Sequence, residues 1–247
     1  AIVPMHYGGH PCDIDALLDA TSSRDVKVIE DAAHAFSAEY KGKKVGSISH
    51  ATCFSFQAIK NITTAEGGAI ATNDEEIARH ARQLRAHGFQ EKRVVALGYN
   101  YTMNELQAAL GISQLRKIHR FQESRRRIAR IYDRGLEQIV EVSPLQVREY
   151  AHHAYHLYVV KVDTSLLKIN RDQFRMAMKA EGIGTQIHFI PIHSHPYYRE
   201  RGYGNTFPNS DQAYEQITTL PLYPSMKDDD AEDVIRAINK VVSFYRK

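Results

Sequence analysis

The 247-residue sequence has few cysteines, no long apolar run and almost no excess of charge. Its two cysteines, Cys12 and Cys53, are too few for a disulfide framework, and their spacing matches no zinc motif. We therefore expect a protein of the reducing cytoplasm. No apolar run approaches the roughly 18 residues that a membrane helix needs, so we expect no membrane span. A net charge of +3 is too small to indicate nucleic-acid binding.

The composition is that of a globular protein, with 43% hydrophobic and 25% charged residues. This predicts one large or two ordinary domains. Two runs of like charge occur: Arg125–Arg127, expected on a solvated helix face, and Asp228–Asp230, expected in the first turn of the last helix, where acidic groups are favoured. The chain opens on AIVPM without an initiating methionine, from which we expect a piece of a longer protein.

Strand-like and helix-like segments alternate in the first half, which predicts a mostly parallel sheet covered by helices. Strands are expected at residues 1–5, 26–31, 51–56 and 67–73, and helices at 13–22, at 75–87 with Asn73 as its cap, and over a long stretch to Gly135 that starts at Asn104 with Gln107. From about residue 155 the pattern changes to a smaller α+β unit. Its strands are expected at 155–162 and 184–189, and its helices at 171–182 and 228–246.

Lys60 is hard to explain as packing, because its neighbours in SFQAIKNITTAEGG are largely apolar. One interpretation is that its methylene stem packs on apolar surface while the ammonium stays in water. The other is that burial lowers the pKa of its amine, which then acts as a nucleophile and forms a Schiff base with a carbonyl. Lys60 by itself does not decide between them.

Several nearby residues suit a pyridoxal phosphate partner for such a lysine. Asp31 closes an apolar strand and could hold the protonated pyridine nitrogen, although it could equally be a helix cap or a solvated strand end. His34 could stack on the ring or bond its phenolic oxygen, or lie on a plain surface turn. Ser55 and Thr63, with the Gly67–Gly68 pair, offer hydroxyls and backbone amides to a phosphate.

Four ordered motifs resemble the DegT/DnrJ/EryC1/StrS family of sugar aminotransferases. They are EDAAHAFSAEYKGKKVGS, SFQAIKNITTAEGGAIATND, RQLRAHGF and LGYNYTMNELQAALGISQL, and the resemblance covers essentially the whole chain. It implies pyridoxal-phosphate enzymes of fold type I, an α/β fold. Residues 1–134 would then form the C-terminal part of a large cofactor-binding domain, and residues 135–247 a small α+β domain.

The resemblance also implies roles for single residues. Lys60 would be the Schiff-base lysine, Asp31 would hold the pyridine nitrogen, His34 would face the ring or its oxygen, and Ser55 would bind the phosphate. Asn100 resembles the asparagine that reaches the phosphate of a neighbouring subunit, which implies a homodimer with shared active sites.

The implied reaction moves an amino group from glutamate to a keto-sugar nucleotide, for the biosynthesis of amino sugars and cell-surface polysaccharide. Residues 184–202 resemble the stretch that borders the sugar pocket in enzymes aminating C4 of UDP-linked 4-keto-6-deoxy sugars, with His188, His193 and Tyr197 as substrate-binding residues. C3 amination and dTDP- or GDP-linked sugars stay open as alternatives.

The sequence departs from the family pattern in two places. Thr102 stands where many relatives have arginine, and an N-terminal part of the pattern, which completes the phosphate-binding cup, has no counterpart. Three other interpretations stay open. A dehydrase branch carries histidine in place of Lys60; His188, His193 and His195 could hold a metal; and the chain could be a folded remnant that binds no cofactor.

Overall fold

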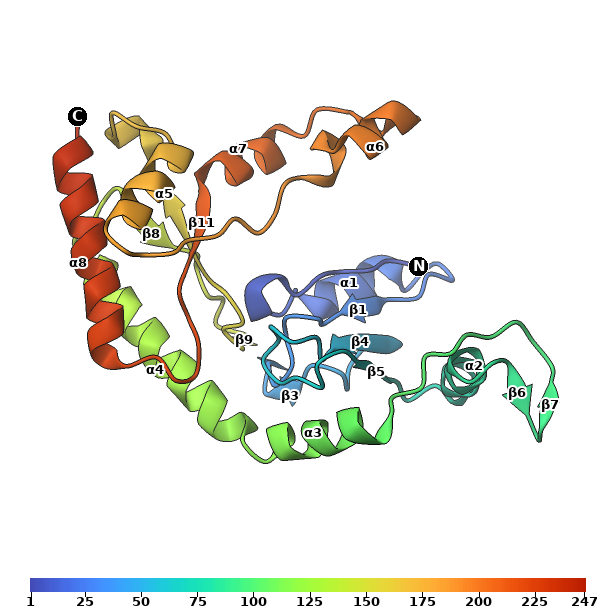
Figure 1. The fold of residues 1–247 in the computed structure, drawn as a ribbon. Helices are drawn as coiled ribbons and strands as arrows, with labels where there is room; N and C mark the ends of the chain where they lie inside the picture. Colours follow the sequence, from blue (N-terminus) through green and yellow to red (C-terminus); the bar gives the residue numbers. More distant parts are fainter. The chain divides into compact units, whose positions relative to one another are not determined.

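The computed structural model of the protein describes residues 1–247, which fall into two compact units (Figure 1). The first unit contains Ala1–Glu123 and Val147–His156, and the second contains Ser124–Gln146 and Leu157–Lys247. The chain therefore passes from one unit to the other after residues 123, 146 and 156. The domain boundary expected between residues 134 and 135 stays a prediction, and each unit is described by itself.

A three-stranded sheet lies at the centre of the first unit, in the order β1-β4-β5. Its strands are β1 (Ile29–Asp31), β4 (Ala51–Ser55) and β5 (Gly68–Ala71). β1 runs parallel to β4, with Asp31 opposite Cys53. β5 runs antiparallel to β4, with Gly68 opposite Ser55. The parallel pair brings the carboxyl ends of β1 and β4 to one edge of the sheet.

The strand expected at residues 1–5 is instead two separate parallel bridges, Ile2 to Val28 and Met5 to Asp31. Between them, the Asp31 N–H donates to the Pro4 carbonyl at 2.8 Å. Pro4 has no N–H with which to return a bond to β1. The ladder is therefore interrupted at this residue.

Helices α1 (Ile14–Thr21), α2 (Glu75–Arg85) and α3 (Glu105–Leu115) belong to the first unit. The capping box predicted at the start of α3 is confirmed: Asn104 accepts from the Gln107 N–H at 2.9 Å, and the Gln107 side chain accepts from the Asn104 N–H at 3.0 Å. The cap predicted for α2 was wrong by one residue. Asp74, not Asn73, accepts the first free N–H groups of that helix, and its carboxylate also favours the positive end of the helix dipole.

The first unit also contains a smaller sheet in the order β3-β2-β9, the short helix η1 (Tyr7–Gly9), and the hairpin of β6 (Phe89–Gln90) and β7 (Arg93–Val94). Its strands are β2 (Glu39–Tyr40), β3 (Lys43–Lys44) and β9 (Ala151–His152). The turn at Lys41 and Gly42 has φ of 48° and 76°, which suits a two-residue hairpin. β9 lies in the segment that returns from the second unit, and Ala154 of that segment is fully buried against Ala32 and Ala35.

The second unit packs helices on an antiparallel sheet in the order β11-β10-β8. The strands are β8 (Val142–Pro144), β10 (Tyr158–Val162) and β11 (Ile217–Leu220); the helices are α4 (Ile118–Leu136), which begins in the first unit, η2 (Thr164–Leu166), α5 (Arg171–Ala180), η3 (Ile192–Ser194), α6 (Pro196–Tyr198), η4 (Arg199–Tyr203), α7 (Pro208–Gln216) and α8 (Asp228–Tyr245). A Cβ on Gly135 would collide with Ile235, so the glycine lets α4 and α8 approach closely.

Two further predicted elements differ in the structure. The long helical stretch to Gly135 is two helices, because α3 ends at Leu115 and α4 starts at Ile118. The strand expected at residues 184–189 is reduced to one bridge, between Gln186 and Thr219. No helix of the structure combines the length and the apolar character that a membrane crossing requires.

The expectation that the run Arg125–Arg127 lies on a solvated helix face is wrong for Arg125, which is buried. Its side chain is only 5% exposed, and its Nη1 donates to the Leu222 carbonyl at 3.1 Å. Burial lowers the pKa of Arg125 to about 10. Arg127 fits the expectation better: it is partly exposed and pairs with Asp228, in the acidic first turn predicted for α8.

Candidate active site

Two of the predicted site residues lie where parallel strands end. Asp31 is the last residue of β1, and its Oδ1 accepts from the Ala33 N–H at 3.0 Å. Ser55 is the last residue of β4, and its Oγ accepts from the Gln57 N–H at 3.4 Å. Since β1 and β4 are parallel, both side chains belong to the edge at which open α/β sheets bind ligands.

Lys60 lies in the loop that joins β4 to β5. The loop is closed at its base, where the Phe56 N–H donates to Gly67 O and the Thr64 N–H donates to Phe56 O, both at 2.8 Å. Within the loop, the Lys60 N–H donates to Gln57 O at 3.0 Å. The Lys60 backbone is therefore held between the ends of two paired strands.

Close packing around Thr64 explains two glycines. A Cβ on Gly67, whose φ is 156°, would collide with the Thr64 hydroxyl. A Cβ on Gly111 of α3 would lie 2.9 Å from Thr64 Cγ2. Thr64 is buried, and its hydroxyl donates to Glu66 O at 2.8 Å, so its rotamer is restrained. The Lys60 loop thus packs tightly on α3 through Thr64 and Gly111.

The electrostatic surroundings of Lys60 suit a reactive amine. Partial burial lowers the pKa of Lys60, and the Asp31 carboxylate opposes this by raising it. The two predicted residues are thus close enough to interact, although they are 29 positions apart in the sequence. A lysine of lowered pKa has more of the neutral amine at neutral pH, which is the nucleophilic form.

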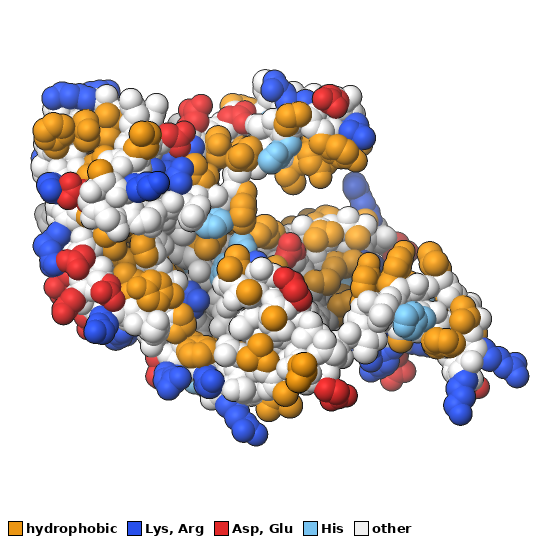
Figure 2. Space-filling model, viewed as in Figure 1, with side chains coloured by type: hydrophobic (Ala, Val, Ile, Leu, Met, Phe, Trp, Pro, Cys, Tyr) orange, Lys and Arg blue, Asp and Glu red, His pale blue; other side chains and the backbone are white.

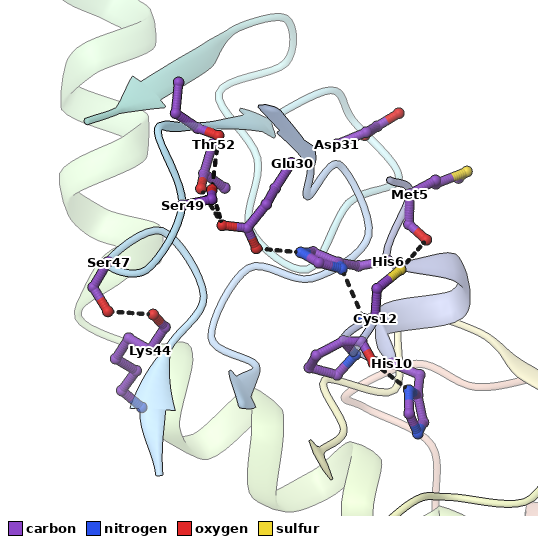
Figure 3. Close-up of polar contacts among 12 residues, drawn as sticks. Met5, His6, His10, Cys12, Glu30, Asp31, Lys44, Ser47, Ser49 and Thr52 are labelled. Atoms are coloured by element: carbon purple, nitrogen blue, oxygen red, sulfur yellow. Dashed lines mark hydrogen bonds and ion pairs between the residues drawn. The ribbon is translucent and has the colours of Figure 1, made fainter. Parts of the chain in front are cut away.

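Glu30 and Asp31 are adjacent in β1, so their side chains point to opposite faces of the sheet (Figure 3). Glu30 is fully buried and accepts hydrogen bonds from His6 Nε2 at 2.6 Å, from Thr52 Oγ1 at 2.8 Å and from Ser49. Burial raises the pKa of Glu30, but these hydrogen bonds lower it by more. The Glu30 network therefore stabilises β1 from the face away from Asp31.

His34 is buried, with 4% of its surface exposed. Its Nδ1 accepts from the Gly8 N–H at 3.3 Å, and its ring lies 4.4 Å from the ring of His156. A neutral His34 with this bond carries its proton on Nε2. Its predicted contact with a cofactor ring stays a prediction.

Two residues that the sequence interpretation missed lie beside Lys60. Asn61 donates from Nδ2 to Ala154 O at 3.0 Å, and its Oδ1 lies 3.1 Å from His156 Nδ1. The only signal in the sequence is that Asn61 follows Lys60 directly. Nothing in the sequence relates His156 to a residue 95 positions earlier.

Asn100 lies on a separate segment of the first unit. It is exposed and forms a bridge with Ala86 after α2, and its two chain neighbours, Tyr99 and Tyr101, stack their rings 5.1 Å apart. Its predicted contact with a neighbouring subunit stays a prediction.

The three residues predicted for the sugar belong to the second unit. His188 Nδ1 lies 2.8 Å from Thr219 Oγ1, and His193 Nε2 lies 2.6 Å from Asp211 Oδ1. Tyr197 is 59% exposed, with the guanidinium of Arg201 3.6 Å from its ring centroid. Exposed apolar side chains gather around α6 and α7 (Figure 2), among them Phe189, Ile190, Ile192, Tyr198, Tyr203 and Phe207. No group of three or more His, Cys, Asp and Glu side chains is arranged to hold a metal.

Comparison with known proteins places this chain in a family. A protein of Methanocaldococcus jannaschii described as uncharacterized is 45% identical over 100% of this chain and 68% of its own. The spore coat polysaccharide biosynthesis protein SpsC of Bacillus subtilis is 42% identical over 98% of this chain and 66% of its own. The chain thus spans about two thirds of the length of these relatives.

Solved structures agree with this comparison. The Helicobacter pylori aminotransferase PseC, involved in the biosynthesis of pseudoaminic acid, has a TM-score of 0.94 at 28% identity, over 99% of this chain and 67% of its own. A Streptococcus pneumoniae protein assigned as a sugar aminotransferase has been solved in a PLP-form and a PMP-form, in agreement with the expected cofactor, pyridoxal phosphate. The predicted α/β fold of pyridoxal-phosphate aminotransferases is confirmed. The profile of the DegT/DnrJ/EryC1/StrS aminotransferase family matches residues 1–239, and the chain belongs to this family.

Proposed function

We propose that the protein uses pyridoxal phosphate to move an amino group from glutamate to a keto-sugar nucleotide. The observation that carries the proposal is the placement of three residues at one edge of the sheet: Asp31 and Ser55 end the parallel strands β1 and β4, and Lys60 lies in the loop after β4. Membership of an aminotransferase family supports it. The presence of Lys60 also argues against the dehydrase branch, which has histidine there.

The residues at this edge fit the cofactor chemically. Lys60 offers a partly buried amine of lowered pKa for the cofactor aldehyde, and Asp31 offers a carboxylate to the pyridine nitrogen. Ser55 would bind the phosphate, and His34 would face the ring. When bound, pyridoxal phosphate withdraws electrons from the carbon that bears the amino group.

Lys60 has two roles in this proposal. Its neutral amine first holds the cofactor, and after the amino donor has displaced it, the same amine accepts and returns the proton at the substrate carbon. Both roles use the neutral amine, and the partial burial of Lys60 lowers its pKa and so favours that form. Asp31 would face the pyridine nitrogen and favour a proton on it.

The proposed enzyme is a cytoplasmic homodimer in which Asn100 of one subunit reaches the phosphate in the other. The exposure of Asn100 supports this role, since its side chain is open to a partner. The proposed substrate is a UDP-linked 4-keto-6-deoxy sugar aminated at C4, with His188, His193 and Tyr197 bordering it. Support comes from SpsC and PseC, whose names refer to spore coat polysaccharide and pseudoaminic acid. Amination at C3 and dTDP- or GDP-linked sugars are the alternatives.

The proposal is tested with purified protein, pyridoxal phosphate and borohydride. We expect a yellow protein in which reduction attaches the cofactor to Lys60, as located by peptide mass spectrometry, and no attachment in Lys60→Ala. Glutamate and a panel of keto-sugar nucleotides then identify the substrate from the amino sugar formed. Absence of cofactor attachment in the unmodified protein would refute the proposal, and attachment without turnover of any sugar would refute the substrate class.

A further inference from the structure

Both polar atoms of the Asn61 side chain are engaged next to Lys60. Nδ2 donates to the Ala154 carbonyl, and Oδ1 lies 3.1 Å from His156 Nδ1. Because Oδ1 can only accept, Nδ1 of His156 carries the proton in this bond. Asn61 and His156 are 5% and 7% exposed, so water does not compete freely for these bonds.

His156 also contacts the other side of the site. Its ring lies 4.4 Å from that of His34 at an interplanar angle of 36°. The Gly9 carbonyl accepts from the Ala154 N–H at 2.9 Å. A Cβ on Gly9 would lie 2.9 Å from the backbone oxygen of His34 and 3.1 Å from the backbone nitrogen of His156. His156 therefore lies in a tightly packed place where residues 8–9, His34, Asn61 and residues 154–156 meet.

We propose that His156 and Asn61 are positioning residues for Lys60. The hydrogen bond between them holds the backbone next to Lys60, while the His156 ring supports His34. The inference rests on the function proposed for Lys60 and goes beyond it, because neither residue is placed in contact with cofactor or substrate.

The need for such a contact follows from the lysine itself. Its long, flexible side chain leaves the position of Nζ dependent on the backbone that carries it, and a misplacement of about 1 Å at a reacting group can cost on the order of 100-fold in rate. An apolar pair could fill the same space without the cost of burying polar groups. A hydrogen-bonded pair has a preferred orientation, and an apolar pair does not.

The test compares His156→Phe with His156→Asn. Phenylalanine keeps a ring beside His34 but cannot donate to Asn61, whereas the asparagine Nδ2 can donate from nearly the place of histidine Nδ1. His152→Phe is the matched control, because His152 lies in the same segment and is exposed in β9. Circular dichroism and urea unfolding show whether each variant folds.

The first readout needs no cofactor. The reaction of Lys60 with an amine reagent is followed against pH by peptide mass spectrometry. In His156→Phe we expect the pH midpoint of Lys60 labelling to rise toward that of an ordinary lysine, because the loosened loop exposes the amine. His156→Asn and His152→Phe should keep the midpoint of the unmodified protein.

The second readout is the affinity for pyridoxal phosphate. We expect His156→Phe to bind it about 3- to 10-fold more weakly, which is the effect of one hydrogen bond. His156→Asn should restore most of the loss. If His156→Phe does not fold, Asn61→Ala, which deletes the same bond from the other side, is compared by both readouts.

A folded His156→Phe protein with unchanged midpoint and affinity would overturn the inference. So would a His156→Asn protein that behaves like His156→Phe, since the hydrogen bond would then not be what positions Lys60. Failure of the proposed function has a different signature. In that case the unmodified protein takes up no cofactor, while the Lys60 midpoints still test the positioning role.

Discussion

Asp31 and Lys60 belong to the same edge of the central sheet, because Asp31 ends β1 and Lys60 lies in the loop after the parallel neighbouring strand β4. Burial lowers the pKa of Lys60, and Asp31 raises it. The two effects on the pKa of Lys60 therefore oppose each other. Their difference determines which fraction of the amine is neutral at a given pH.

Replacing Asp31 by asparagine should change this balance in a defined direction. Without the carboxylate, only the lowering influence remains, so the midpoint of Lys60 labelling should fall to lower pH in the cofactor-free protein. Aminotransferase activity should also fall, because the pyridine nitrogen loses its partner. Asp19→Asn, at an exposed position of α1, is the control and should leave the midpoint unchanged. An unchanged midpoint in Asp31→Asn would show that the carboxylate does not act on Lys60.

The buried Glu30 predicts a contribution to acid unfolding. Its hydrogen bonds with His6, Ser49 and Thr52 lower the pKa of Glu30 in the folded state below the ordinary value of 4.5. Its stabilising contribution is therefore present above about pH 4.5 and is lost as the pH falls through the folded pKa. Urea unfolding at several pH values measures this contribution. Between about pH 6 and pH 3, the free energy of unfolding of Glu30→Gln should depend less on pH than that of the unmodified protein. Equal slopes would contradict this assignment.

Gly111 and Thr64 should show strong coupling in a double-mutant cycle. Gly111→Ala places a Cβ 2.9 Å from Thr64 Cγ2, and overpacking of this kind costs about 1–3 kcal/mol, although alanine in a helix is favoured over glycine by about 1 kcal/mol. Thr64→Ser removes Cγ2 but keeps the hydroxyl. We therefore expect Gly111→Ala to destabilise the native protein and to stabilise the Thr64→Ser protein, as measured by urea unfolding. Additive effects would contradict the close packing of α3 on the Lys60 loop.

The buried Arg125 should contribute more to the free energy of unfolding than Arg130, which is exposed on the same helix. Arg125→Ala removes a buried side chain and leaves the Leu222 carbonyl without its donor, with an expected loss of about 2–3 kcal/mol in the free energy of unfolding. Arg130→Ala, at an exposed position of the same helix, should change it by less than about 0.5 kcal/mol. Thermal and urea unfolding of both variants measure the difference, and similar effects would contradict the structural role of Arg125.

Local chemistry explains which features could be predicted. The α3 capping box depends on Asn104 and Gln107, which are three residues apart, and a side chain of each reaches the backbone of the other. The interruption of the first strand at Pro4 is equally local, since proline has no N–H to donate to the neighbouring strand. The break between α3 and α4 has no comparable signal, since apolar residues continue at helical spacing on both sides of it.

The sequence by itself determined the family and the residues that define it. Lys60, Asp31, His34 and Ser55 could be proposed as site residues because the motifs around them are contiguous and characteristic. Only the tertiary structure decided that Arg125 is buried, that Asp31 acts on Lys60, and that Asn61 bonds to His156. The physical reason is that burial and long-range hydrogen bonds depend on which segments meet in space. Asn61 and His156 are 95 residues apart, and no local pattern in the chain relates them.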